Sequence, residues 1–234
     1  NGVSVTDYKY DYLGNLRKVT LPKPNSSSVE SERMFYTYEY DSTYQQFVKS
    51  VTDAYGLTSE SNYSNFGLLL GQKDVNGIVF TYKYDPSRRL IEFKGPYHNN
   101  WTLRNEYKHD QASGLYYAVT QHNLIDEITG NNNSVLHTSS FTDGLGRIIQ
   151  TKKQLDTEED CGGSGYSFAV SGTQIYDEFG RVVESYLGQQ QLNCGGNFSV
   201  TLEKYEPLQH DVLEKTENWY DNEDRLLQTH IYGL

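Results

Sequence analysis

The chain has 234 residues, enough for one sizeable domain or two small ones. Its formal net charge is −11, and this acidic excess disfavours nucleic acid and anionic membrane surfaces as partners. No apolar run is long enough for a membrane span. The 21 tyrosines and 20 glycines, against a single methionine, predict many short strands joined by turns and little helix.

The N-terminus shows no sign of a protein start. Asn1-Gly2-Val3-Ser4 contains neither an initiator methionine nor the basic and apolar segments of a signal peptide. A strand-like Tyr8-Lys9-Tyr10 follows almost at once and leads into the first turn. We therefore expect residues 1–234 to form a single β-sheet repeat region that is a fragment of a longer protein.

A four-residue turn, with Asp or Ser first and Gly fourth, recurs along the chain. In a type I turn the first side chain accepts a backbone N–H two residues on. The glycine takes the positive φ with which the chain enters the next strand as a bulge. We predict structural roles for the first and fourth residues, which are Asp11 and Gly14, Asp53 and Gly56, Ser64 and Gly67, Asp74 and Gly77, Asp143 and Gly146, and Asp177 and Gly180.

The spacing of the turns predicts how the strands are connected. From Asp41 the turns begin at residues 41, 53, 64, 74 and 85, so each interval holds one turn and one short strand. Consecutive turns of an antiparallel meander lie at opposite edges of the sheet. Asp41, Ser64 and Asp85 should therefore share one edge, and Asp53 and Asp74 the other.

Later intervals are longer, and their extra residues are typical of loops. Examples are the segments 95–100, 130–133 and 157–163. We expect regular turns at one edge of the sheet and longer loops at the other.

The two cysteines lie in equivalent places in successive intervals. Cys161 follows Asp143 by 18 residues, Cys194 follows Asp177 by 17, and both begin Cys-Gly-Gly. Neighbouring loops can bring two such residues within disulfide distance. A Cys161–Cys194 bridge is the prediction, and two free thiols are the alternative.

Four stretches resemble the YD or RHS repeat, whose pattern is Tyr-Asp-x-x-Gly-Arg followed by an alternating strand. The full pattern stands at Tyr176-Asp177-Glu178-Phe179-Gly180-Arg181, and residues 142–147 differ in having Thr142 first. The stretches that begin at Tyr10 and Tyr220 keep part of it. The chain resembles most the B component of bacterial insecticidal toxin complexes. The resemblance adds Arg147 and Arg181 to the predicted structural residues.

This resemblance implies a long, twisted and curved antiparallel up-and-down sheet of about 15 strands that forms an arc or part of a shell. In the family the shell encloses a toxic C-terminal polypeptide, which implies a secreted or cell-surface shell segment. The implied partners are neighbouring repeats of the parent chain and the enclosed toxin, and exposed edge strands would allow self-association. An extracellular adhesion or carbohydrate-binding surface is the alternative.

No constellation of residues points to catalysis, so we expect neither an enzyme nor a cofactor. Gly162-Gly163-Ser164-Gly165 lacks the second glycine of a nucleophile elbow, since Tyr166 stands in its place. Asp221-Asn222-Glu223-Asp224 groups oxygen ligands that suit calcium, but the repeat places a turn there, which explains these residues better. The family's self-cleaving core is not indicated, because Asp85-Pro86 lies in an ordinary turn.

Overall fold

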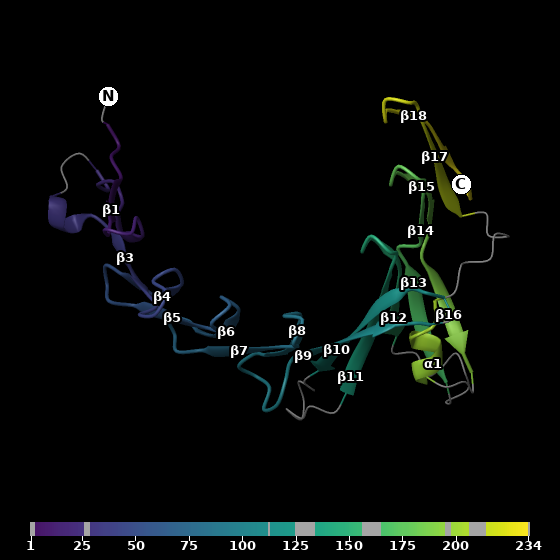
Figure 1. Ribbon diagram of the computed structural model, residues 1–234, viewed down its shortest axis with the longest axis horizontal. Coiled ribbons are helices and arrows are strands. Elements are labelled where there is room, and N and C mark those ends of the chain that lie inside the picture. The colour runs from purple at the N-terminus through teal and green to yellow at the C-terminus, as the bar shows by residue number, and fades with distance from the viewer. Residues whose placement is uncertain are drawn as a thin grey trace. The chain divides into compact units, whose positions relative to one another are not determined.

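The computed structural model describes residues 3–25, 29–111, 113–124, 134–155, 165–194, 198–205 and 214–233. The chain divides into two compact units, residues 1–102 (unit 1) and residues 103–234 (unit 2). The described strands belong to two open antiparallel sheets, one of 14 strands and one of four (Figure 1). The single repeat region over 1–234 stays a prediction.

Unit 1 is a meander in which every strand pairs antiparallel with the strand before it in sequence. Its strands are β1 (Asp7–Tyr10), β2 (Leu16–Thr20), β3 (Phe35–Tyr40), β4 (Val48–Asp53), β5 (Thr58–Tyr63), β6 (Leu69–Lys73), β7 (Val79–Tyr84) and β8 (Leu90–Lys94). A 3-10 helix, Glu30–Glu32, lies in the connection between β2 and β3.

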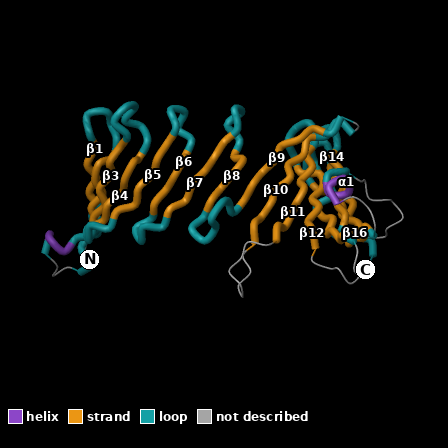
Figure 2. Tube along the Cα trace, turned by 90° about the horizontal axis from the view of Figure 1, so that it is seen from below, coloured by secondary structure: helices purple, strands orange, loops and turns teal. Residues whose placement is uncertain are grey.

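The turns of unit 1 alternate between the two edges, as their spacing predicts. Those that begin at Asp41, Ser64 and Asp85 follow β3, β5 and β7, and those at Asp53 and Asp74 follow β4 and β6. Figure 2 shows the strands side by side with turns at both ends. The longer connections, residues 21–34 and 95–102, leave from the edge that Asp53 and Asp74 share.

A β-bulge accompanies each turn of unit 1 that follows a strand ending in tyrosine. The strand register shifts at Tyr10, Tyr40, Tyr63 and Tyr84. Each of these tyrosines stands directly before the first residue of a turn, so the extra residue is taken up in the strand that follows the turn. The turn thus sets the register of the hairpin.

Unit 2 contains the rest of the larger sheet and all of the smaller one. The larger sheet continues in the order β9 (Leu103–His109), β10 (Tyr116–Leu124), β11 (Ser134–Thr142), β12 (Ile148–Leu155), β13 (Tyr166–Ser171) and β16 (Gln189–Asn193). The smaller sheet has the order β14 (Gln174–Tyr176), β15 (Val182–Tyr186), β17 (Lys215–Tyr220) and β18 (Leu226–Ile231).

The two units differ in how their sheets are covered. Every buried hydrophobic side chain among the described residues lies in unit 2. There the short helix α1 (Phe198–Leu202) covers part of the sheet, with Leu202 against Val119 and Phe168. No second layer covers the described part of unit 1, so cross-strand pairs such as Phe80 and Phe93, with stacked rings, do the packing.

The structure confirms the predicted all-β antiparallel fold with very little helix. Two features differ from the sequence prediction. The described residues contain 18 strands, where about 15 were expected, and four of them, β14, β15, β17 and β18, form a second sheet. Helix α1 is the other. No helix among the described residues is long and apolar enough to cross a membrane.

Two turn glycines provide a matched test of the packing in unit 1. Gly56 and Gly67 both have a positive φ, +81° and +78°. Only open space surrounds a Cβ at Gly56, whereas a Cβ at Gly67 would lie 2.6 Å from a ring carbon of Phe47. We expect Gly56→Ala to lower the free energy of unfolding by about 1 kcal/mol through backbone strain.

Gly67→Ala should lower the free energy of unfolding further, because the added methyl group also displaces the Phe47 ring from its stack on Tyr63. Chemical denaturation of both variants measures the difference. Equal losses would contradict this account of the Phe47 ring.

Candidate functional site

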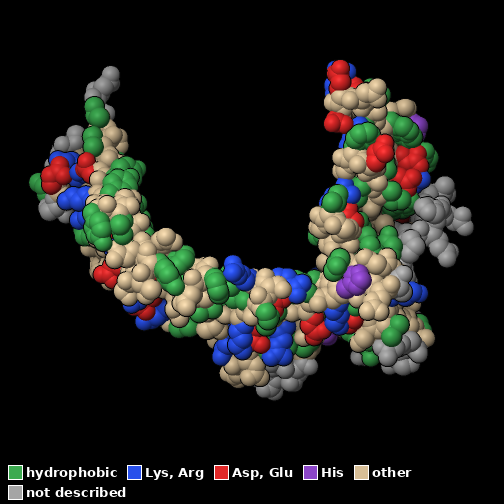
Figure 3. Space-filling model, in the orientation of Figure 1, with side chains coloured by type: hydrophobic (Ala, Val, Ile, Leu, Met, Phe, Trp, Pro, Cys, Tyr) green, Lys and Arg blue, Asp and Glu red, His purple; other side chains and the backbone are tan. Residues whose placement is uncertain are grey.

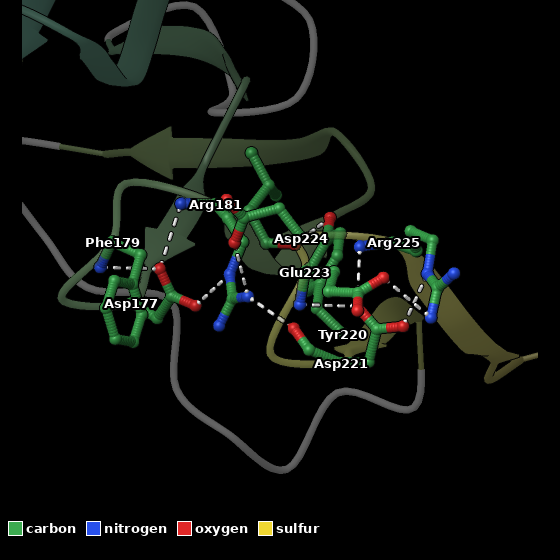
Figure 4. Close-up of polar contacts among 9 residues, drawn as sticks. Asp177, Phe179, Arg181, Tyr220, Asp221, Glu223, Asp224 and Arg225 are labelled. Carbon is green, nitrogen blue, oxygen red and sulfur yellow. Dashed lines mark hydrogen bonds and ion pairs between the residues drawn. The ribbon is translucent and has the colours of Figure 1, made fainter.

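The Tyr-Asp turns are the candidate functional site, and the turn at Asp177 shows their geometry in full (Figure 4). Asp177 Oδ1 accepts the backbone N–H groups of Phe179 at 3.0 Å and Arg181 at 2.9 Å. Asp177 Oδ2 accepts Nε of Arg181 at 2.6 Å. Gly180, with φ +84°, donates its N–H to the Asp177 carbonyl at 3.0 Å. One carboxylate therefore holds the turn and the arginine after it.

The same two backbone donors recur at other predicted turns. They lie two and four residues after the first turn residue, at Asp11, Asp53, Ser64, Asp74, Asp143 and Asp221. Sequence reasoning predicted the first donor but missed the second, which lies beyond the glycine. The second bond ties the turn to the start of the next strand.

The arginine of the pattern also joins one repeat to the next. The Arg147 guanidinium lies 3.9 Å from the ring centre of Tyr176, in the next Tyr-Asp turn. The Tyr176 hydroxyl donates to Gln174 Oε1 at 2.7 Å and also lies 3.4 Å from the carbonyl of Ile148. Arg181 and Tyr220 repeat the arrangement, with the guanidinium 4.9 Å from the ring centre. We call this pair of contacts the Arg–Tyr tie.

An Arg–Tyr tie also exists in unit 1, where the arginine occupies a different position. Arg17 binds Asp11 and lies 4.9 Å from the ring centre of Tyr40. Tyr40 donates its hydroxyl to the carbonyl of Leu16 at 3.1 Å. Asn15, which replaces the arginine of the pattern, donates to Asp11 instead. The tie is thus kept although the sequence pattern is not.

The two predicted turns at the opposite edge lack this arrangement. After Asp53 and Asp74 the chain continues with Leu57 and Ile78, so no arginine follows the glycine. The sequence predicted the same structural role for all turns. The structure separates turns that only reverse the chain from turns that also join repeats.

The tyrosines of the ties are site residues that sequence reasoning did not include. Their constant place before the turn aspartate was the signal. From the sequence alone, that place predicts packing on a shared face of the sheet, which needs no hydroxyl.

Arg181 reaches furthest into the next turn. Its Nη1 donates to the Asp221 carbonyl at 3.1 Å and to Asp224 Oδ1 at 2.8 Å. Asp224 has a φ of +62° in the place of the turn glycine. Arg225 binds Asp221 at 2.7 Å and Glu223 at 3.1 Å. The carboxylates that suggested calcium are therefore bound to arginines, and the described residues contain no group of three that could hold a metal ion.

The turn bonds lower the pKa of their aspartates. At Asp177 partial burial raises the pKa, but the backbone and side-chain bonds from Arg181 outweigh it and the net shift is downward. At Asp221 the bonds from the backbone and then the side chain of Arg225 lower the pKa. Bonds from the backbone N–H of Phe47 and neighbouring residues lower that of Asp41 to about 2. The lowered pKa values of these three aspartates therefore come from bonds within their turns. The pKa of Glu217, in β17, is also lowered, by bonds from Lys215 and Tyr232.

Cys194, which directly follows β16, is disulfide-bonded. Cys161 is the other cysteine of the sequence and lies outside the described residues, so the Cys161–Cys194 pairing stays a prediction. So does a turn at residues 206–209, which are also outside them.

Charged side chains are partly gathered by sign. On the visible face, Lys and Arg gather near β8 and β9, acidic groups gather over the C-terminal strands, and elsewhere the two signs stand close together (Figure 3). Ion pairs such as Lys83 with Glu92 at 2.6 Å and Lys215 with Glu184 at 3.5 Å account for part of this pattern.

A lysine substitution distinguishes an arginine that joins two repeats from one that serves its own turn. Arg181 contacts Asp177, Tyr220 and Asp224, whereas Arg225 is 71% exposed and binds carboxylates of its own turn alone. Lysine keeps the charge but loses the planar fork. We expect Arg181→Lys to lower the melting temperature by about 2–4 °C and Arg225→Lys to change it by less than about 1 °C.

Thermal denaturation followed by circular dichroism measures both variants. If Arg225→Lys lowers the melting temperature as much as Arg181→Lys, the tie does not stabilise the sheet.

The lowered pKa of Asp41 predicts a loss of stability in acid. Because the folded-state pKa is about 2 and the ordinary value is 3.8, the contribution is full above about pH 5 and is lost as the pH falls toward 2. The denaturation midpoint should therefore decrease as the pH is lowered from 5 to 2. Asp41→Asn should flatten this dependence.

Glu178→Gln is the control, because this exposed turn residue makes no hydrogen bond or ion pair with a described residue. The midpoints of that variant should follow the same pH dependence as the unaltered chain. A slope unchanged by Asp41→Asn would contradict the prediction.

Comparisons with known proteins show the fold. No family model and no curated protein matches the chain. A crystal structure of TcdB2-TccC3 matches with a TM-score of 0.70 and 16% identity over 97% of this chain and 12% of that chain. The crystal structure of TcdB2-TccC3-TEV gives 0.68 and 14%, over 97% and 15%. The Photorhabdus luminescens Tc holotoxin pore gives 0.66 and 14%, over 97% and 14%.

The chain thus spans about an eighth of the solved chains that it matches. Those structures carry RHS shells. With its Tyr-Asp turns and its open antiparallel sheet, this chain has the fold of an RHS-type shell segment.

Proposed function

We propose that the chain is a structural segment of a shell wall that encloses a polypeptide within a secreted toxin. The observation that carries the proposal is the Arg–Tyr tie, which at Arg17, Arg147 and Arg181 joins one repeat to the next through side chains as well as strands. Such nearest-neighbour contacts extend a sheet strip without a central core. The fold shared with Tc toxin structures supports the same role.

The proposed partners follow from this role. A strip built by nearest-neighbour contacts would continue into further repeats of a parent chain, with the enclosed polypeptide at one face. The fully exposed strands β1 and β18 at the ends of the two sheets offer backbone groups for pairing. Two copies of the chain pairing through these edge strands would use the same backbone hydrogen bonds as pairing with further repeats.

The proposal assigns no catalytic step to the chain. The lowered pKa values of the turn aspartates arise from hydrogen bonds within the turns themselves. A catalytic group would instead direct a perturbed side chain at a substrate. We therefore infer an architectural role that needs no cofactor.

Proteolysis of the full polypeptide that contains this chain tests whether the chain helps to enclose another polypeptide. An enclosed polypeptide should survive protease as a discrete fragment while the shell is intact. Substituting alanine for Arg147 and Arg181 together removes two ties and should expose that fragment. Arg225→Lys is the matched control and should leave it protected.

Two results would count against the proposal. In the first, no fragment of the unaltered protein resists the protease. In the second, the fragment stays protected when both ties are removed and the melting temperature of the sheet has fallen.

A further inference from the structure

A large hydrophobic side chain recurs at the third position of the turns that begin with Asp or Ser and end with Gly. A type I turn accepts most residues at this position, so turn chemistry does not require an apolar one. Single exposed hydrophobic residues are ordinary on protein surfaces, but their recurrence at one position of a repeat indicates a shared contact. Five of the six turns follow this pattern, with residues that are 53% to 80% exposed, and we call them the turn tips: Leu13, Tyr55, Phe66, Leu145 and Phe179.

Along the edge of unit 1 where the Tyr-Asp turns lie, each turn touches the next. Asn15, in the first turn, donates its side-chain amide to the Gln45 carbonyl of the second at 2.8 Å. The Phe47 ring of the second turn lies against the glycine of the third. The Arg88 guanidinium of the fourth turn lies 4.2 Å from the ring centre of Phe66 in the third. This edge is therefore a continuous row of turns that holds its tips in fixed places.

Unit 2 has the same kind of edge. A Cβ at Gly180 would lie 2.9 Å from Nη1 of Arg147, which places the turn of Phe179 directly beside that of Leu145. The Arg–Tyr tie between Arg147 and Tyr176 joins the same two turns. Two turn tips are therefore neighbours on this edge.

The spacing of the turns indicates the kind of partner. Neighbouring strands lie about 4.8 Å apart, so turns at one edge of the sheet follow one another about every 10 Å. A second strip of the same repeat has turns at the same interval, and its edge can fit between the tips of this one. We propose that the turn tips pack against the turn edge of another strip of the same repeat, which a neighbouring stretch of the wall in the parent chain supplies. This contact rests on the shell wall proposed above.

A membrane surface suits the turn tips less well. Phe179 directly follows Asp177 and Glu178, and the whole chain carries a net charge of −11. Anionic lipid headgroups would repel such an edge. The edge of another strip carries arginines beside its carboxylates, so opposite charges can face each other there.

The size of the tips limits the strength of the contact. A buried aromatic side chain covers about 150–250 Å². Two tips on the edge of one unit thus fall well short of the roughly 1,200 Å² of a stable interface between separate proteins. A contact this small forms when both strips belong to one chain, because the tether raises the effective concentration. We therefore expect it within the parent polypeptide rather than between free copies.

Photo-cross-linking in the full polypeptide that contains this chain tests the contact. A benzophenone-bearing phenylalanine replaces Phe66 in one protein and Phe179 in another, and mass spectrometry identifies the peptides joined on irradiation. We expect both positions to join to turns of repeats that are distant in the sequence. Val79 is the matched control, since it is 52% exposed but lies within strand β7, and the same replacement there should join to no turn.

Circular dichroism of each protein checks that the replacement leaves the sheet folded. Products with adjacent repeats alone, products with the enclosed polypeptide alone, no product, or equal joining of Val79 to distant turns would each overturn the proposal. The result is separate from protection against protease. Turn-to-turn products without a protected fragment would keep the edge contact and remove the enclosure, and protection without such products would do the reverse.

Discussion

The hydrogen bonds from one turn carboxylate to two backbone N–H groups are the interaction on which the rest of the fold depends. Asp177 accepts one N–H inside its turn and another at the start of the next strand. The second bond fixes where β15 begins, and the bulge at Tyr176 follows from it. Since the bulge sets which residues face each other, the turn determines the register of the whole hairpin. Side-chain chemistry at one position thus directs a strand pairing.

Register then places the arginine and tyrosine that join successive repeats. Arg181 comes directly after the turn glycine, so it is held by Asp177 and directed at Tyr220. In unit 1, where the described residues contain no buried hydrophobic core, contacts of this kind and cross-strand aromatic pairs are what hold neighbours together. Stability is then a sum over adjacent repeats, and substitutions should act locally. Unit 2 differs because Leu202 of α1 adds a small apolar core.

The sequence predicted the regular parts of the structure, because turn chemistry is local. The spacing from Asp41 to Asp85 was enough to order the strands of unit 1. It did not predict the branch at β14, since that depends on which strand pairs with β13, a choice made between distant residues. Helix α1 was missed because five residues are too few for a helical period.

Function in a repeat protein is better sought where the pattern is broken than where it is kept. A kept position such as Asp143 serves the turn, and its carboxylate oxygens bind the turn and Arg147. A residue that departs from the repeat pattern is not required by the turn. Tyr44 lies in a turn that is two residues longer than its neighbours, because Asp41 Oδ1 accepts the N–H of the sixth residue on, whereas Ser64 Oγ accepts that of the fourth. Such a departure from the repeat is where a role beyond building the wall should be sought.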